Sequence, residues 1–163
     1  MAGFDDELVG LLPRLRRFAR ALSRDAADAD DLCQAAVEKA LGARAQWQPG
    51  TRMDSWMYRI MRNTWIDKTR ARSRAAQTFV HEDAGLGVGD AGDRAIEARV
   101  ELGRVERAMA QLPDEQREAV ALVLVEGLAY KEAAELLDVP MGTLTSRLVR
   151  GRQALLAMLG EAA

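Results

Sequence analysis

Apolar residues recur at three- and four-residue intervals over most of the chain, which is the spacing of helices that bury one face. In the first half, this spacing predicts a helix over about residues 5–22. It predicts a second helix that Asp25 caps and that ends near Leu41. Residues 48–51, with the sequence Gln-Pro-Gly-Thr, then interrupt the pattern. A third helix is predicted to follow, over about residues 53–72.

The apolar spacing is lost over residues 75–92, where four glycines are interspersed with Asp and Ala, and this composition predicts a flexible linker. Helical spacing resumes at about Asp93, and another helix is predicted over Asp114–Val125. The fold class is therefore predicted to be all-α, with two small helical domains at 1–74 and 93–163 joined by the linker. On the helix from Asp93, the residues expected to face inward are Ala95, Ala98, Leu102, Val105 and Met109.

A helix-turn-helix pattern occupies residues 127–156. The short helix Tyr130–Leu137 precedes Asp138, a residue type that tolerates a left-handed backbone, and Pro140 suits the start of the next helix. On that next helix, leucines recur on one face while hydroxyl and basic groups occupy the other. Such a face suits contact with phosphates and base edges in a DNA major groove, although a surface hairpin with ordinary solvated arginines has the same pattern. The polar face carries Thr143, Ser146, Arg147, Arg150 and Arg152.

Composition and charge extend this picture. Hydrophobic residues make up 48% of the 163 residues and aromatic residues only 5%, and this balance, with many Ala, Leu and Arg, favours helices over sheets. The formal net charge of -2 conceals separate charge clusters, which predict local DNA contact, at least one other partner and weak DNA binding by the free chain. Basic clusters lie at 14–24, 59–74 and 147–152, and acidic clusters lie at 5–7, 25–31 and 82–101.

Several classes of protein are disfavoured. No apolar run approaches the length of a membrane span, and the first residues lack the features of a secretion signal. A single cysteine, Cys33, excludes an intrachain disulfide and fits a reducing cytoplasm, and we expect it to be a small packed hydrophobe. The only histidine, His81, lies in the predicted linker, so we expect no enzyme, no metal site and no cofactor.

Three stretches in this order and spacing resemble bacterial RNA polymerase sigma factors, specifically the extracytoplasmic-function (ECF) class of the sigma-70 family. Asp28–Lys39, DADDLCQAAVEK, resembles the acidic helix of sigma region 2. Trp47–Arg72, WQPGTRMDSWMYRIMRNTWIDKTRAR, resembles the part that engages the minus-ten promoter element. Leu112–Leu156, beginning LPDEQREAVALVLVEGLAYKEAA, resembles region 4.

The resemblance implies a function and a set of partners. It implies that the chain binds core RNA polymerase and promoter DNA and directs promoter-specific transcription initiation. Sigma factors of this class are usually restrained by an anti-sigma protein, so the resemblance also implies such a partner and a role in a stress response. The WQPGT sequence is similar to that of alphaproteobacterial general-stress ECF factors.

For polymerase binding, the resemblance implies the acidic helix of region 2, whose carboxylates and amide can face a basic coiled coil. Ala35 stands where relatives often carry an acid, so that contact is either missing or supplied by Glu38. Each of these acids could instead serve only to stabilise the start of its helix. The implied polymerase-binding residues are Asp28, Asp30, Asp31, Gln34 and Glu38.

For the minus-ten element, the resemblance implies that the loop at 47–54 holds a non-template base extruded from the duplex. Trp47 stands where relatives have an aromatic residue, which can stack on such a base. Trp56 lies on an apolar stripe and is expected in the core rather than as a DNA wedge, whereas Trp65 fits either role. The residues implied for base contact are Trp47, Gln48, Arg52 and Asn63, and those implied for phosphate contact are Arg59, Arg62, Lys68, Arg70 and Arg72.

For the minus-thirty-five element, the resemblance implies that region 4 reads duplex DNA. Thr145 replaces a basic residue common at its position, which removes a candidate for reading guanine and leaves the promoter sequence open. The positions that match family DNA contacts are Thr145, Ser146, Val149 and Arg150, while Arg147 and Arg152 are expected to bind phosphate or pair with acids.

Two other interpretations remain at this point. An ordinary transcription factor would bind a palindromic operator without polymerase, usually as a dimer, and would leave residues 28–34 and 47–72 unexplained. A helical adaptor without DNA function would present all three arginine clusters as solvated faces. Transcription with purified core polymerase separates both from a sigma factor.

Overall fold

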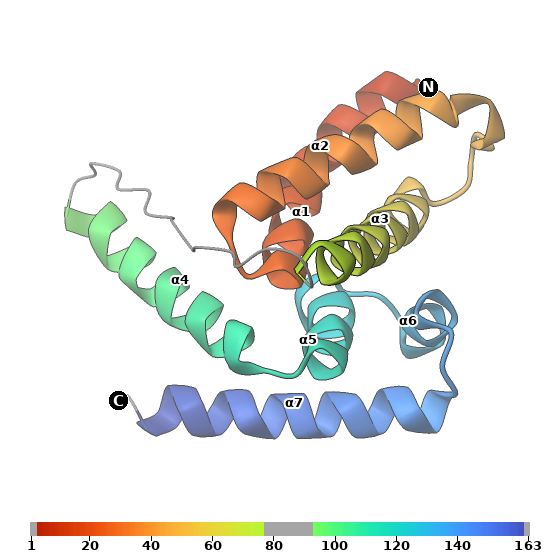
Figure 1. Cartoon of the computed structure of the whole chain (residues 1–163). Coiled ribbons are helices and arrows are strands. Elements are labelled where there is room, and N and C mark those ends of the chain that lie inside the picture. Colours follow the sequence, from red (N-terminus) through yellow and green to blue (C-terminus); the bar gives the residue numbers. More distant parts are fainter. Residues whose placement is uncertain (1–2, 77–92, 162–163) are drawn as a thin grey trace. The chain divides into compact units, whose positions relative to one another are not determined.

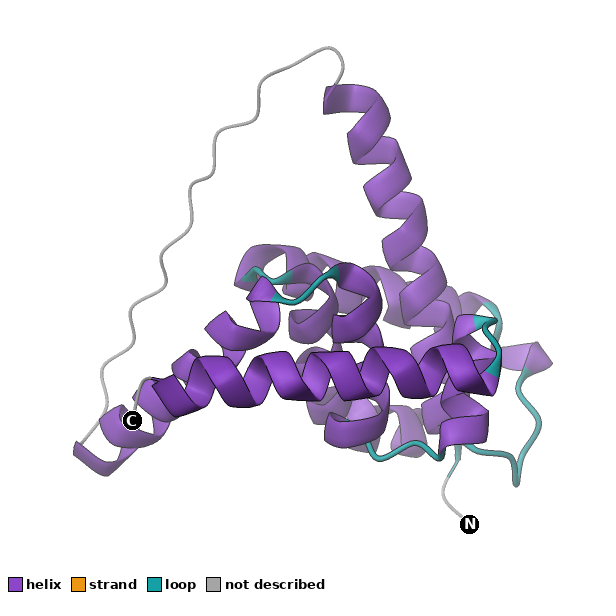
Figure 2. Cartoon of the chain, turned by 90° about the horizontal axis from the view of Figure 1, so that it is seen from below, coloured by secondary structure: helices purple, strands orange, loops and turns teal. Residues whose placement is uncertain are grey.

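The computed structural model describes residues 3–76 and 93–161, and it divides the chain into two compact units, Met1–Gly85 and Leu86–Ala163. Every regular element of the described residues is helical, as Figure 2 shows, and this confirms the predicted all-α fold. The linker predicted at 75–92, which includes His81, lies almost entirely outside the described residues. None of the helices in the described ranges is long and apolar enough to cross a membrane.

The first unit contains three long helices that pack against one another, α1 (Phe4–Ser23), α2 (Ala26–Gly42) and α3 (Met53–Ala76) (Figure 1). A short 3-10 turn, η1 (Arg44–Gln46), follows α2. Asp25 caps α2 as the sequence predicts, because its side chain accepts a hydrogen bond of 2.8 Å from the backbone amide of Ala27. The chain turns between α1 and α2 at Arg24, whose φ of 68° places it in the left-handed region.

The core of this unit consists of the apolar faces of its three helices, which are fully or almost fully buried. Phe18 of α1 packs edge-to-face on Tyr58 of α3, with ring centroids 5.1 Å apart. The free Cys33 is buried on α2, which confirms that it packs as a small hydrophobe. The largest buried side chains of this unit are Leu15, Phe18, Leu22, Leu32, Met57, Tyr58 and Met61.

The second unit contains α4 (Asp93–Gln111), α5 (Asp114–Val120), α6 (Tyr130–Leu137) and α7 (Met141–Glu161), with α7 contacting the other three. The helix predicted over Asp114–Val125 is present, but its second half, η2 (Ala121–Val125), is a π-helical turn. There the amide of Glu126 donates to the carbonyl of Ala121, one residue further back than in an α-helix.

The helix-turn-helix has the predicted form. Asp138 ends α6 in the left-handed conformation, with a φ of 55°, and α7 begins directly after Pro140. Leu144 and Leu148 of α7 are buried, so the opposite face of that helix is presented outward. Gly151 lies where α7 approaches α5 closely, since a Cβ there would be only 2.8 Å from Cγ2 of Val120.

The inward face predicted for α4 is largely wrong. Ala95, Ala98, Leu102 and Val105 are exposed, and of the five predicted residues only Met109 is buried. The predicted apolar residues do recur at helical spacing along α4. An apolar stripe is buried only where another element packs against it, however, and the spacing does not show where that happens. Within this unit, the buried part of α4 and the segment that follows it is limited to Ala108, Met109 and Leu112.

Candidate nucleic-acid interface

The acidic face of α2 is exposed, as binding to a large partner requires. Asp30, Asp31, Gln34 and Glu38 are exposed, whereas Asp28 is half-buried. Gln34 and Glu38 lie one turn apart, with 3.5 Å between the amide nitrogen and the carboxylate. A shallow cavity of about 340 Å³ separates this face from α1, lined by Leu12, Arg16, Asp30, Cys33, Gln34, Val37 and Glu38.

Cys33, one of the residues that line this cavity, is buried. Burial raises the pKa of the Cys33 thiol, and the nearby Arg16 guanidinium, which lowers it, only partly offsets that effect. The thiolate is therefore disfavoured at neutral pH, so Cys33 contributes packing rather than reactivity.

Asp28 is paired with Arg72, a residue implied for phosphate contact. The two terminal nitrogens of the Arg72 guanidinium, Nη1 and Nη2, donate to the Asp28 carboxylate, Nη1 at 2.8 Å, and this bidentate pair joins α2 to the last turns of α3. The hydrogen bonds to Asp28 raise the pKa of Arg72 further above its ordinary value. Two residues assigned to different partners by the resemblance thus contact each other.

The loop between η1 and α3 has little burial apart from its first residue, Trp47. Trp47 is half-buried, and the residues from Gln48 to Arg52 are exposed. Gly50 has a φ of 88°, and Thr51 Oγ1 donates to the carbonyl of Gln48 at 2.6 Å, which closes a tight turn. The indole nitrogen of Trp47 is buried and has no acceptor among the residues that the structure describes.

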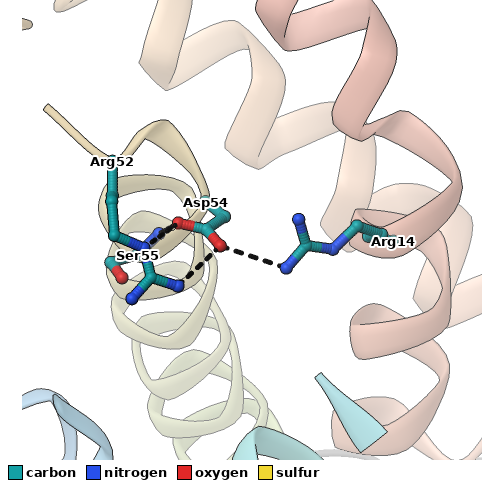
Figure 3. Close-up of polar contacts among 4 residues, drawn as sticks. All are labelled: Arg14, Arg52, Asp54 and Ser55. Carbon is teal, nitrogen blue, oxygen red and sulfur yellow. Dashed lines mark hydrogen bonds and ion pairs between the residues drawn. The ribbon is translucent and has the colours of Figure 1, made fainter. Parts of the chain in front are cut away.

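The end of this loop is held by an ionic network at the start of α3 (Figure 3). Arg52 donates to both carboxylate oxygens of Asp54, at 3.1 Å and 2.9 Å. Arg14 of α1 donates to the same carboxylate at 3.1 Å, and the amide of Ser55 donates at 2.7 Å. Desolvation would raise the pKa of Asp54, but the hydrogen bonds from Arg52, Ser55 and Arg14 together lower it below its ordinary value.

The basic residues of α3 do not all share one face. Arg59, Asn63 and Arg70 are exposed and lie on the same side of the helix, opposite the buried Met57 and Met61. Arg62 is half-buried to one side. Lys68 and Arg72 follow the line of the buried face into the last turns of the helix. The structure therefore brings together Arg59, Asn63 and Arg70, but not Lys68 and Arg72.

On α7 the implied DNA-contacting positions form two groups. Thr145, Val149 and Arg152 lie on one exposed stripe, and the hydroxyl of Thr145 donates to the carbonyl of Met141 at 2.9 Å. Arg147 pairs with Glu115 of α5 at 3.5 Å, in agreement with the expectation that it binds phosphate or an acid. The second group lines a cavity of about 320 Å³ between α5 and the start of α7, and consists of Thr143, Ser146, Arg147 and Arg150. The other residues that line this cavity are Pro113, Glu115, Gln116 and Gly142.

Comparison with known proteins identifies this arrangement. Residues 9–75 match the model of sigma-70 region 2, and residues 102–155 match that of sigma-70 region 4. The ECF RNA polymerase sigma factor EcfG of Rhodopseudomonas palustris is 34% identical over 154 residues, covering 94% of this chain and 83% of that protein. The chain belongs to the ECF RNA polymerase sigma factors. As such, it is a transcription initiation factor that directs RNA polymerase to promoters.

Solved structures of similar proteins show the same fold. The sigma factor RpoE from Bartonella quintana, in complex with the anti-sigma factor NepR, is 30% identical with a TM-score of 0.82, and the match covers 96% of each chain. CnrH in complex with the cytosolic domain of CnrY is 25% identical with a TM-score of 0.67, covering 99% of this chain and 92% of that chain.

Sequence reasoning missed several residues that shape the site of this sigma factor. Asp54 holds Arg52, and the signal for it was the Arg-Met-Asp spacing at the start of a helix. Arg117 is 2% exposed on α5 and donates to the carbonyl of Leu112 at 2.9 Å and to Asp114 at 2.7 Å. It fastens the start of α5 to the preceding turn, and no local pattern distinguishes it from a surface arginine.

Proposed function

We propose that the acidic face of α2 is the contact surface for core RNA polymerase. Four of the five implied residues, Asp30, Asp31, Gln34 and Glu38, are exposed there. Asp28 is already paired with Arg72, so its contribution is to hold α2 against α3 rather than to meet the partner. The exposed carboxylates attract a basic surface of the polymerase and help to fix its position on α2.

The minus-ten element is engaged by the loop at 47–54 and by the exposed face of α3. Arg59, Asn63 and Arg70 face solvent together, so one DNA strand can contact all three, with the arginines on phosphates and the asparagine on a base edge. The loop supplies Trp47, Gln48 and Arg52 for the extruded base. Arg62 lies beside this face, and Lys68 contributes positive charge at a distance rather than a direct contact. The charge of Arg72 is balanced by its partner Asp28.

The minus-thirty-five element is read by the outward side of α7. The observation that carries the proposed function is the contrast along this helix, where Leu144 and Leu148 are buried while Thr145, Ser146, Val149 and Arg150 are exposed. This is the orientation that a recognition helix needs in a major groove. Arg147 and Arg152 bind the flanking phosphates, and Thr143 lies at the margin of the contact.

An anti-sigma factor restrains the chain, and its release connects transcription to a stress signal. Both solved relatives described above are bound to another protein, in one case an anti-sigma factor. The exposed apolar side chains of α4 give such a partner something to cover, since Ile96, Val100, Leu102 and Val105 are 42–58% exposed. The chain acts in the cytoplasm and catalyses no reaction itself.

Transcription with purified core polymerase and a genomic library of promoter fragments tests this proposal. Addition of the chain should produce transcripts from a defined set of start sites that core polymerase alone does not use. An autonomous transcription factor would bind its operator equally well without polymerase, and an adaptor would change no start site; either result would refute the proposed function.

A further inference from the structure

Phe4, the first residue of helix α1, contacts the loop at 47–54 that we propose holds the extruded base. Phe4, in the first turn of α1, packs edge-to-face on Trp47 with ring centroids 5.6 Å apart, and on Trp56 of α3 with centroids 5.9 Å apart. Arg44 of η1 stacks over the Phe4 ring at 5.0 Å and also pairs with Asp5. Phe4 therefore connects Arg44 and Trp47, which precede α3, to Trp56 within α3.

Helix α1 also contacts the last residue of the same loop. Arg14 lies about three turns after Phe4 on α1, and it donates to Asp54, which in turn accepts hydrogen bonds from Arg52 (Figure 3). The Arg14 guanidinium additionally lies 5.7 Å from the centre of the buried Tyr58 ring, so its position is set by the core. A cavity of about 340 Å³ has α1 as one wall and residues 51–54 as the other.

The loop between these two anchors has few other restraints. The side chains of Gln48, Pro49, Gly50 and Thr51 are exposed, and the turn between Gln48 and Thr51 is local. The orientation of a loop of this kind is set mainly by where its ends are held. Because the two ends are held by α1, the orientation of Trp47 and Arg52 depends on a helix that itself has no part in the proposed DNA contact.

We propose that Phe4 and Arg14 are positioning residues for recognition of the minus-ten element. Phe4 fixes the orientation of the Trp47 ring, and Arg14 fixes the position of Arg52 through Asp54. The loop therefore has its binding conformation before the base enters. Neither residue contacts DNA in this account. The inference rests on the proposed function of the loop, because a brace for a loop matters to promoter opening only if the loop holds the base.

Opening of a promoter by reconstituted holoenzyme tests the inference. The promoter fragment carries 2-aminopurine in the non-template strand of the minus-ten element, and its fluorescence rises when that base leaves the stack. Phe4→Leu and Arg14→Gln should each slow opening about 5- to 20-fold, less than the roughly hundredfold loss that a misplacement of about 1 Å can cause. Phe4→Tyr keeps the ring and should retain the wild-type rate.

Controls on α1 separate positioning from general damage to the fold. Val9→Ala removes an apolar side chain that is 63% exposed, and Asp6→Asn removes an exposed charge, so both should open the promoter at the wild-type rate. The affinity for core polymerase should be unchanged in every variant. If Phe4→Leu and Arg14→Gln weaken polymerase binding as much as they slow opening, the residues only support the fold and the inference is wrong.

Double-mutant cycles test whether Phe4 acts on promoter opening through Trp47, and Arg14 through Asp54. Phe4→Leu should add no further loss in a Trp47→Ala background, and Arg14→Gln should add none in an Asp54→Ala background. Additive losses would overturn the inference. If Trp47→Ala and Arg52→Ala leave opening unchanged, the proposed function of the loop fails and the inference fails with it. If those two variants slow opening but the α1 variants do not, the inference alone fails.

Discussion

Asp54 shows how a single carboxylate organises the surroundings of a binding loop. Its side chain is only 12% exposed, and it accepts hydrogen bonds from Arg14, Arg52 and the amide of Ser55. These donors outweigh the desolvation of the carboxylate, so the pKa of Asp54 lies below its ordinary value. Ionised Asp54 therefore stabilises the folded state.

The stability contributed by Asp54 should depend on pH in a defined direction. Its pKa in the folded state lies below the ordinary value of 3.8, so the contribution is complete well above pH 3.8 and disappears as the pH falls through the folded-state pKa. At pH 7, Asp54→Asn should lower the free energy of unfolding by about 1 kcal/mol, less than the roughly 1.5–3 kcal/mol typical of charged hydrogen bonds, because both arginines are partly exposed.

Urea unfolding of the wild type and Asp54→Asn at several pH values measures this contribution. The difference between the two proteins should shrink steadily below about pH 4, as the wild-type carboxyl takes up its proton. A difference that stays constant or grows as the pH falls would show that the carboxylate is not stabilised by its donors.

Arg150 is the residue of α7 from which we expect the largest effect on promoter recognition. It is exposed beside Ser146, and a guanidinium can donate two hydrogen bonds to a guanine edge. Arg150→Ala should weaken the binding of holoenzyme to its promoter by about 1–3 kcal/mol and relax the preference at one base pair of the minus-thirty-five element. Gln111→Ala, an exposed change on α4, is the control.

Competition between promoter fragments that differ only in the minus-thirty-five element measures both effects of Arg150→Ala. Uniform weakening on all fragments would mean that Arg150 contacts phosphate rather than a base. Unchanged binding on all of them would remove Arg150 from the interface.

At the scale of the elements, α5 and α7 are held at a separation that only glycine allows. A Cβ on Gly151 would lie 2.8 Å from Cγ2 of Val120 and 3.4 Å from Cβ of Gln116, and the branched Val120 cannot easily rotate away. This contact fixes the angle between α5 and α7, the proposed recognition helix. A displacement of α7 here would move every side chain that faces DNA.

Gly151→Ala should therefore destabilise the protein, although alanine is the better helix former. The gain of about 1 kcal/mol in helix propensity is smaller than the overpacking cost of about 1–3 kcal/mol, so we expect a net loss of about 1 kcal/mol. Gly10→Ala on α1 has no atom within 4 Å of the new Cβ and should stabilise the protein by roughly 0.5–1 kcal/mol. Thermal unfolding compares the two variants, and stabilisation by both would show that α5 and α7 do not approach so closely.

The elements that were predicted accurately are those whose signals are local. The sequence places the start and end of α1 within one residue, and the Asp25 cap and the left-handed Asp138 are seen as expected. The π-helical turn η2 and the exposure of α4 were not predictable, because both depend on how neighbouring helices pack. The pairs Arg14–Asp54 and Arg72–Asp28 join residues 40 and 44 positions apart, which no local pattern reveals.

At the scale of the whole molecule, the distribution of charge separates the tasks of the two units. The net charge of -2 gives the free chain little long-range attraction for DNA, yet each unit carries an exposed basic face. We propose that the acidic face of α2 meets a different partner, core polymerase. We infer that core polymerase, by binding both units, raises their effective concentration at one promoter far above what either reaches alone.

Footprinting of one promoter fragment with the chain alone, core polymerase alone and the two together tests this central claim most directly. We predict protection of both the minus-ten and the minus-thirty-five elements in the mixture, and of neither by the chain alone at the same concentration. Equal protection by the chain without polymerase would contradict the account, as would a mixture whose footprint is the same as that of core polymerase.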